Sequence, residues 1–249
     1  MKSLKSILDH PSISMSYFFP SGRFVSEPFV VESGDVKLAC LFYKRDVPLC
    51  IIHFHGNGEE VVDYMDSPLL ELDASILFAE YRGFGMSGGV PQLVAMMDDV
   101  EAFVQASGYS PQNIVFMGRS VGSIYAIEAA ARYPECAGLV IESGIADVAQ
   151  RLLMRIDPAQ IGTSAETIVQ ECRKYFDHEK KLRSCKGRSL VLHARHDTLV
   201  DHTHAYSLHR WSGGDSRLVI FEKGDHNSVL RCNRQRYLDE VDRFLGSIV

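Results

Sequence analysis

The 249-residue sequence lacks several features that would assign it to other classes of protein. No apolar stretch approaches the roughly 20 residues of a membrane-spanning helix, and Asp9-His10-Pro11 interrupts the N-terminus too early for a secretory signal. Basic residues are outnumbered, with 26 Lys and Arg against 32 Asp and Glu, and form no long run. We therefore expect no integral membrane segment and no nucleic-acid partner, and the sequence leaves the oligomeric state open.

The cysteines lack the spacing of a structural framework. No CxxC motif is present, and several of the six cysteines lie within apolar runs. This distribution favours reduced core thiols over a disulfide framework or a zinc site, and it predicts a cytoplasmic protein. The cysteines are Cys40, Cys50, Cys136, Cys172, Cys185 and Cys232.

Apolar residues make up 46% of the chain and occur as short runs that alternate with helical patterns. A hairpin is predicted at 29–43, and buried strands at 50–54, 74–79, 114–117, 138–141, 189–193 and 217–221. Alternation of this kind predicts an α/β fold with a mostly parallel sheet flanked by helices.

Two regions fall outside this alternation. Residues 145–186 separate two predicted strands by far more than the usual two to six residues, and their apolar spacing is helical. We therefore predict a single domain, 1–249, with a small helical cap at about 145–186. The N-terminal aromatic cluster, 17–20, is expected to pack on the sheet edge without a function of its own.

A serine lies at the turn between a predicted strand and helix. Gly118-Arg119-Ser120-Val121-Gly122 follows the apolar run 114–117 and precedes a stretch of helix-forming residues. In this setting the pattern is typical of a nucleophile elbow, in which a strained turn presents the serine hydroxyl at the end of the sheet. The alternative is a buried turn serine whose glycines serve packing.

A carboxylate and a histidine follow two later strands. Asp197 comes after the strand at 189–193, and His226 after the strand at 217–221. The carboxyl ends of parallel strands meet at one edge of a sheet, so a serine nucleophile, a histidine base and an orienting aspartate are predicted to converge there. Taken singly, His226 could be a surface histidine and Asp197 a turn or cap aspartate. Lesser candidates for the acid are Asp147, Asp201 and Asp225.

Attack by Ser120 would require donors for the developing oxyanion. Val121 N–H begins the elbow helix, and Asn57 N–H lies in the glycine-rich loop after the strand at 50–54, so both are assigned to the oxyanion hole. Tyr175 and Phe176, on the apolar face of a cap helix, are predicted to form an acyl pocket above Ser120, and Arg119 is assigned with them to substrate binding.

Five motifs in this order resemble the α/β-hydrolase superfamily. They are HFHGNG at 53–58, EYRGFGMSGG at 80–89, GRSVG at 118–122, HARHD at 193–197 and GDHN at 224–227. Within it, the chain is similar to the branch of α/β-hydrolase-type depalmitoylases and serine aminopeptidase-like hydrolases. The resemblance implies an eight-stranded, mostly parallel sheet, no cofactor and acyl transfer to water. The N-terminus departs from the membrane-anchored depalmitoylases because it lacks their cysteine cluster.

Two other signals are rejected. Gly83 to Gly88 matches the dinucleotide fingerprint but does not open a helix, and the histidine-rich run 193–209 has the wrong spacing to converge on one metal ion. We therefore predict a cofactor-independent serine hydrolase that cleaves a small-molecule or acylated ester or thioester, with amide cleavage a weaker variant. The alternative is a ligand-binding protein with a slow or vestigial triad.

Overall fold

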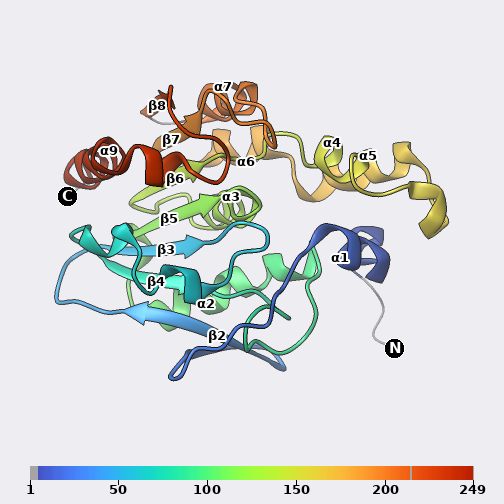
Figure 1. The fold of residues 1–249 in the computed structure, drawn as a ribbon, viewed down its shortest axis with the longest axis horizontal. Helices are drawn as coiled ribbons and strands as arrows, with labels where there is room; N and C mark the ends of the chain where they lie inside the picture. The colour runs from blue at the N-terminus through green and yellow to red at the C-terminus, as the bar shows by residue number, and fades with distance from the viewer. Residues whose placement is uncertain (1–4, 214, 249) are drawn as a thin grey trace.

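A computed structural model describes residues 5–213 and 215–248, which contain an eight-stranded sheet (Figure 1). The strand order is β1-β2-β4-β3-β5-β6-β7-β8; β2 is antiparallel to its neighbours β1 and β4, and the pairs from β4 to β8 are parallel. The predicted fold class is confirmed. The strands are β1 (Phe29–Ser33), β2 (Val36–Tyr43), β3 (Cys50–Phe54), β4 (Ser75–Ala79), β5 (Ile114–Arg119), β6 (Gly138–Glu142), β7 (Arg188–Ala194) and β8 (Ser216–Phe221).

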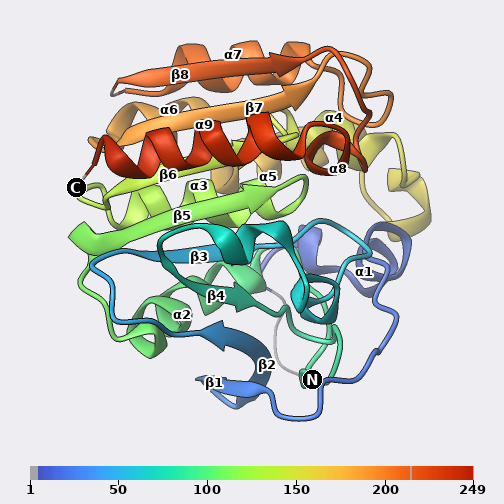
Figure 2. The same ribbon diagram turned by 60° about the vertical axis from the view of Figure 1, so that its left-hand side comes forward.

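Helices cover both faces of the sheet, as Figures 1 and 2 show. Along β5, Phe116 packs into the core on the side of α2, α3, α6 and α7, whereas Val115 and Met117 pack on the side of α9. A parallel sheet buried on both faces needs apolar residues at successive positions, which explains its continuous apolar runs. The α-helices are α1 (Pro11–Tyr17), α2 (Asp99–Ser107), α3 (Gly122–Arg132), α4 (Val148–Leu153), α5 (Ala165–Tyr175), α6 (His178–Ser184), α7 (Thr203–Trp211), α8 (Val229–Cys232) and α9 (Arg234–Gly246).

Short 3₁₀ turns complete the chain. They are η1 (Ile7–Asp9), η2 (Val61–Tyr64), η3 (Pro68–Glu71), η4 (Ala95–Met97), η5 (Pro111–Asn113) and η6 (Pro158–Ile161). In the parts of the chain that the structure describes, no helix is long and apolar enough to cross a membrane.

The carboxyl ends of the parallel strands point toward α1 and α4, which lie beyond the same edge of the sheet (Figure 2). Within the predicted insertion, α6 packs against α3 and α7 and so belongs to the layer that covers the sheet. Helices α4 and α5 project further, and we refer to residues 145–176 as the cap. Residues 17–23, from the last residue of α1 onward, lie at the same edge and form what we call the N-terminal strap.

Candidate active site

Ser120 occupies a strained turn between β5 and α3. Its backbone φ is +52°, a left-handed conformation that side chains other than glycine rarely adopt. A Cβ at Gly118 would lie 2.5 Å from the carbonyl oxygen of Gly122, and one at Gly122 would lie 2.0 Å from that of Phe54. Both glycines are therefore required for the elbow helix to approach the sheet closely.

Three side chains from the ends of different strands form one hydrogen-bonded chain. His226 Nε2 lies 2.8 Å from Ser120 Oγ, and His226 Nδ1 lies 2.6 Å from Asp197 Oδ2. All three residues are buried, with exposed fractions of 7% for Ser120, 6% for His226 and 5% for Asp197. The structure thus brings together a hydroxyl, an imidazole and a carboxylate in the geometry of a nucleophile, a base and an orienting acid.

The Asp197 carboxylate accepts several hydrogen bonds. Its Oδ1 accepts from the backbone N–H groups of Leu199 and Val200, at 2.9 and 2.8 Å. His193 Nε2 lies 3.2 Å from Oδ2, so two imidazoles share that oxygen. Burial alone would raise the pKa of Asp197, but the hydrogen bonds from His193 and His226 outweigh it and hold the pKa well below its usual range. The carboxylate is therefore ionised at any pH at which a histidine base is neutral.

The other carboxylates considered for the acid serve the backbone elsewhere. Asp147 Oδ1 accepts from Gln150 N–H and caps α4. Asp201 accepts from Thr203, and Asp225 closes the turn that precedes α8. In the described part of the chain, none of the three carboxylates forms a hydrogen bond or ion pair with the His226 ring.

The two residues predicted for the oxyanion hole border the same pocket as Ser120. Asn57 and Val121 both line the pocket that contains Ser120, and within residues 5–213 and 215–248 neither N–H donates to a protein acceptor. The Asn57 side chain has a different contact, because its amide donates to the Tyr17 carbonyl and its Oδ1 accepts from Phe19 N–H at 3.2 Å. Asn57 therefore also fastens the N-terminal strap to this loop.

A buried ion pair supports the loop that carries Asn57. His55 Nε2 lies 2.8 Å from Glu80 Oε1, and His55 Nδ1 lies 2.8 Å from the Gly56 carbonyl oxygen. A carbonyl and a carboxylate at the two ring nitrogens favour the doubly protonated form of the ring. Burial lowers the pKa of His55, but the Glu80 carboxylate more than compensates and raises it overall. The Tyr81 hydroxyl, which donates to the His55 carbonyl at 2.8 Å, fixes the same loop.

The assignment of Arg119 to substrate binding requires correction. Its Nη1 lies 2.6 Å from Glu59 Oε1 and its Nε lies 3.2 Å from Glu142 Oε1. Its Nη2 donates to the His226 carbonyl at 2.8 Å and to Asn227 Oδ1 at 3.1 Å. All three guanidinium nitrogens are thus engaged by the protein, so Arg119 joins the His226 loop to the loop that carries Asn57 and Glu59, although it also lines the Ser120 pocket.

The pocket at Ser120 has a volume of about 180 Å³, and part of its wall was not predicted. Tyr17 and Phe19 of the N-terminal strap line it, although the aromatic cluster at 17–20 was expected to pack on the sheet edge. The apolar part of the wall is completed by the cap and by the loop after β7. The lining residues are Tyr17, Phe19, Asn57, Arg119, Ser120, Val121, Ile145, Arg151, Arg155, Leu199, Val200, His226 and Asn227.

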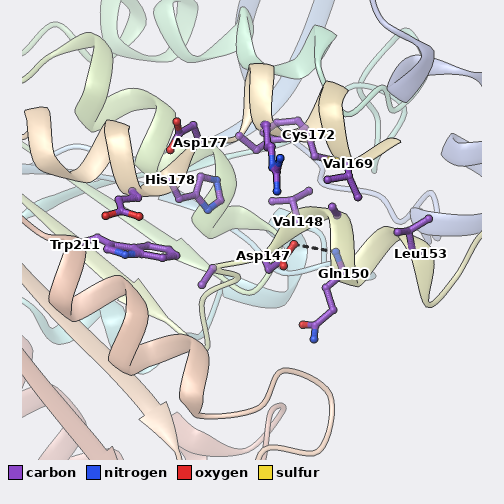
Figure 3. Close-up of a pocket in the computed structure, with 14 residues that line it drawn as sticks. Asp147, Val148, Gln150, Leu153, Val169, Cys172, Asp177, His178 and Trp211 are labelled. Carbon is purple, nitrogen blue, oxygen red and sulfur yellow. Dashed lines mark hydrogen bonds between the residues drawn. The ribbon is translucent and has the colours of Figure 1, made fainter. Parts of the chain in front are cut away.

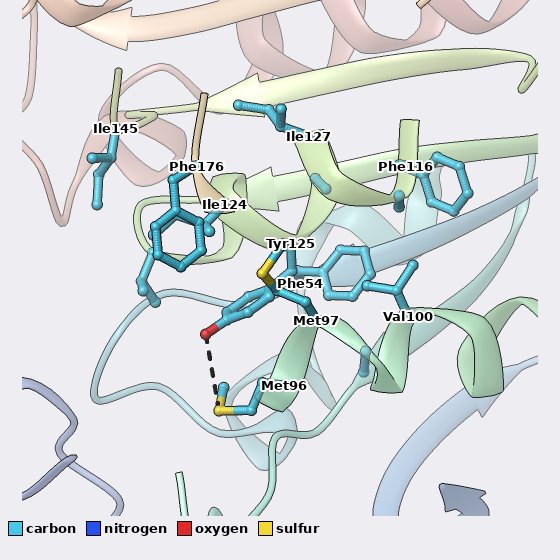
Figure 4. Close-up of a cluster of buried hydrophobic side chains, with 14 of the residues drawn as sticks. Phe54, Met96, Met97, Val100, Phe116, Ile124, Tyr125, Ile127, Ile145 and Phe176 are labelled. Carbon is cyan, nitrogen blue, oxygen red and sulfur yellow. Dashed lines mark hydrogen bonds between the residues drawn. The ribbon is translucent and has the colours of Figure 1, made fainter. Parts of the chain in front are cut away.

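Tyr175 and Phe176 do not line this pocket, which corrects the predicted acyl site. Phe176 is buried in the hydrophobic core beside Ile124 and Ile145 (Figure 4), and it also borders a separate cavity of about 580 Å³. That cavity lies among α4, α5 and α7 and contains no member of the triad (Figure 3). The Tyr175 hydroxyl donates to the Lys5 carbonyl at 3.2 Å, on the far side of the cap.

The histidines of the 193–209 run have separate partners. His193 contacts Asp197, His204 Nδ1 accepts from Ala146 N–H, and His209 Nδ1 lies 2.8 Å from Ser216 Oγ. Among the described residues, no three His, Cys, Asp or Glu side chains are grouped so that they could hold a metal ion.

Known proteins are similar to this chain over most of its length. Residues 46–161 match the family described as serine aminopeptidase, S33. The chain is 24% identical to alpha/beta hydrolase domain-containing protein 17C of Mus musculus over 231 residues, which cover 88% of this chain and 67% of that protein. The human protein of the same name is covered over 65% of its length, so the chain spans about two thirds of these relatives.

Solved structures show the same architecture. The esterase Pf2001 of Pyrococcus furiosus superposes with a TM-score of 0.69 at 18% identity, covering 88% of this chain and 91% of that one. Est1E of Butyrivibrio proteoclasticus, solved with ferulic acid bound, gives a TM-score of 0.70 at 18% identity and covers 88% and 98% of the two chains. At this level of identity, the likeness establishes the fold.

Proposed function

We propose that the chain, whose fold and relatives are those of α/β-hydrolases, is a cofactor-independent serine hydrolase that cleaves a carboxylic ester or thioester. The observation that carries the proposal is the hydrogen-bonded chain from Ser120 Oγ through His226 to Asp197. The relatives and the esterase folds support a hydrolase in general. The choice of Ser120 as nucleophile and of an ester as substrate is our own step.

In the proposed reaction, Ser120 Oγ attacks the substrate carbonyl carbon while His226 Nε2 takes the hydroxyl proton. The tetrahedral oxyanion is bound by the N–H groups of Asn57 and Val121, and such donors contribute several kcal/mol to lowering the barrier. His226 then returns the proton to the leaving alcohol or thiol as the carbon–heteroatom bond breaks. An acyl group remains on Ser120 Oγ.

Water completes the cycle by the same steps. His226 takes a proton from the water, whose oxygen attacks the acyl carbon, and the proton passes to Ser120 Oγ as the acid is released. Asp197 stays ionised throughout, accepts the Nδ1–H of the ring and stabilises the imidazolium that forms at each attack. Ester and water supply every atom, so the reaction needs no cofactor.

Turnover of a graded substrate panel tests this proposal. The panel contains p-nitrophenyl esters, acyl thioesters and aminoacyl p-nitroanilides, the last because the matching family is described as an aminopeptidase family. We expect ester and thioester hydrolysis in wild type and none above background in Ser120→Ala. Hydrolysis of the anilides alone would replace esters by amides as substrates, and equal turnover by Ser120→Ala would reject the nucleophile.

A further inference from the structure

The charged side chains that line the Ser120 pocket are all positive. Three arginines line it, and no Asp or Glu is among its described lining residues. The charge of Arg119 is neutralised by its two carboxylate partners, Glu59 and Glu142. Arg151 and Arg155 form no ion pair with any carboxylate in the described part of the chain. Two cations without a carboxylate partner among the described residues therefore line the same pocket as the proposed nucleophile.

Both arginines belong to the cap segment above the strand ends. Arg151 lies on α4 and Arg155 two residues beyond it. Arg151 Nη1 contacts Met154 Sδ at 3.3 Å, and the Arg155 guanidinium carbon lies 5.3 Å from the centre of the Phe19 ring. Neither contact uses a strong acceptor, so most guanidinium N–H groups remain available to a ligand.

The Tyr17 hydroxyl adds a third donor to the pocket wall. Burial raises the pKa of Tyr17 to about 12, and the charges of Arg151 and Arg155 oppose that rise. The hydroxyl therefore keeps its proton at neutral pH. It is also close enough to Arg151 and Arg155 for their charges to act on it. No residue that the structure describes accepts its hydrogen bond, although Tyr17 is only 5% exposed.

Arg151 and Arg155 differ from other unpaired arginines in their position, because both line the Ser120 pocket. The chain carries a formal charge of −6, and some exposed arginines, such as Arg173 and Arg210, also have no carboxylate partner among the described residues, but these do not line the Ser120 pocket. A concave site that carries one sign of charge raises the local concentration of ligands of the opposite sign. Guanidinium groups bind carboxylates and phosphates in a planar, two-point geometry.

We propose that the substrate carries an anionic group, a carboxylate, phosphate or sulfonate, which Arg151 and Arg155 bind next to its scissile carbonyl. This inference rests on the proposed serine hydrolase and names its substrate class. The pocket volume of about 180 Å³ is below the usual 300–1,000 Å³ of ligand pockets, so the part enclosed beside Ser120 is small.

Two matched fluorophosphonates test the inference without requiring that the true ester be known. One probe ends in a carboxylate and the other, of equal length, in a carboxamide. The second-order rate of Ser120 labelling is measured by intact mass on the full chain. We expect the carboxylate probe to react about tenfold faster, and the preference to shrink in 1 M salt. The same comparison can be made on kcat/KM with two p-nitrophenyl esters of adipic acid, one whose far end is a free carboxylate and one whose far end is a carboxamide.

The decisive variant is R151Q/R155Q, in which the carboxylate preference should fall to about one. The matched control is R173Q/R210Q, which removes two exposed arginines of α5 and α7 that do not line the Ser120 pocket, and which should keep both rates. A preference that survives in R151Q/R155Q, or a ratio near one in wild type, would overturn the inference and leave the hydrolase intact. No labelling by either probe would instead reject the proposed function.

A second experiment asks whether the two arginines bind an anionic substrate or an anionic membrane surface. Binding to phosphatidylserine vesicles is measured for wild type and for R151Q/R155Q. Equal labelling by the two probes, together with vesicle binding that only the double variant loses, would assign the arginines to an anionic membrane surface and overturn the substrate inference. Carboxylate preference without vesicle binding supports it.

Discussion

The triad and the pocket wall above it are built in different ways. Ser120, Asp197 and His226 each follow a strand of the sheet, and all three are less than 10% exposed. The wall comes from the N-terminal strap, the cap and the loop after β7, and it includes the half-exposed Phe19 and Leu199, at 45% and 42%. The sheet therefore positions the three triad side chains, whereas peripheral segments far apart in the sequence line the pocket beside them.

The largest expected effect is on the triad side of this contrast. Asp197→Asn should lower kcat by about 10⁴, because the His226 ring loses the acceptor that fixes its tautomer and stabilises its charged form. The control is Asp201→Asn, since Asp201 is exposed and bonds only to its own turn. Activity on a short p-nitrophenyl ester is the measurement. A mild loss in Asp197→Asn, or a severe one in Asp201→Asn, would move the acid elsewhere.

The next largest effect is expected on stability, from the ion pairs of Arg119 with Glu59 and Glu142. Arg119→Gln leaves the half-buried carboxylate of Glu59 and the buried carboxylate of Glu142 without their cation, and we expect the free energy of unfolding to fall by about 3 kcal/mol. Denaturant unfolding measures the change. Arg195→Gln breaks an exposed pair with Glu222 and should cost less than about 1 kcal/mol. Similar losses in the two variants would show that Arg119 does not join the two loops.

The attachment of the N-terminal strap should depend on pH through Glu60. Burial favours a higher pKa for this carboxyl, but the backbone N–H groups of Arg23, Gly85, Gly22 and Ser21 lower it to about 2, from an ordinary 4.5. A depressed pKa stabilises the folded state above pH 4.5, and that stabilisation is lost as the pH falls from 4.5 toward 2.

Glu60→Gln should therefore lower the free energy of unfolding by about 2 kcal/mol at pH 7, and the difference from wild type should shrink on acidification through that window. Thermal and denaturant unfolding at several pH values measure it. Glu71→Gln, which removes an exposed partner of Arg234, is the control and should show little change at any pH. A difference that is constant with pH would argue against an ionised Glu60 as the anchor of the strap.

The smallest expected effect is on selectivity. Phe19→Ala removes half-exposed apolar surface from the pocket, so the ratio of kcat/KM between butanoyl and acetyl esters should change about threefold to tenfold. Tyr175→Ala removes an aromatic ring of similar size from the other side of the cap and should leave that ratio as in wild type. If only the Tyr175 variant changed the ratio, the wall assigned here would be wrong.

The sheet and the triad could be predicted because their signals are local. Strand ends in a parallel sheet meet at one edge, so residues that follow apolar runs are brought together whatever the loops do. Gly118 and Gly122 bracket Ser120 for a steric reason that the sequence itself displays. The alternation of side chains along β5 could also have placed Arg119, because residues 115, 117 and 119 share one face of the strand. Val115 and Met117 pack on the α9 side of the sheet.

The pocket wall could not be predicted in the same way. Helical spacing correctly identifies an apolar face on α5 that includes Ile168 and Cys172, but it does not say which neighbour that face covers. Phe176 packs into the core, and Tyr175 lies on the far side of the cap. Tyr17 and Phe19 line the Ser120 pocket because Asn57 and Glu60 bind the strap across about forty residues of sequence, and no local pattern encodes these contacts.

Covalent labelling tests the central claim most directly. Wild type and Ser120→Ala are treated with a small, neutral fluorophosphonate, and intact mass and peptide mapping locate the adduct. The account predicts one adduct per chain in wild type, on Ser120, and none in the folded variant, because only a hydroxyl activated by His226 beside an oxyanion hole reacts quickly with such probes. An unlabelled but correctly folded wild type, or equal labelling of Ser120→Ala, would contradict it.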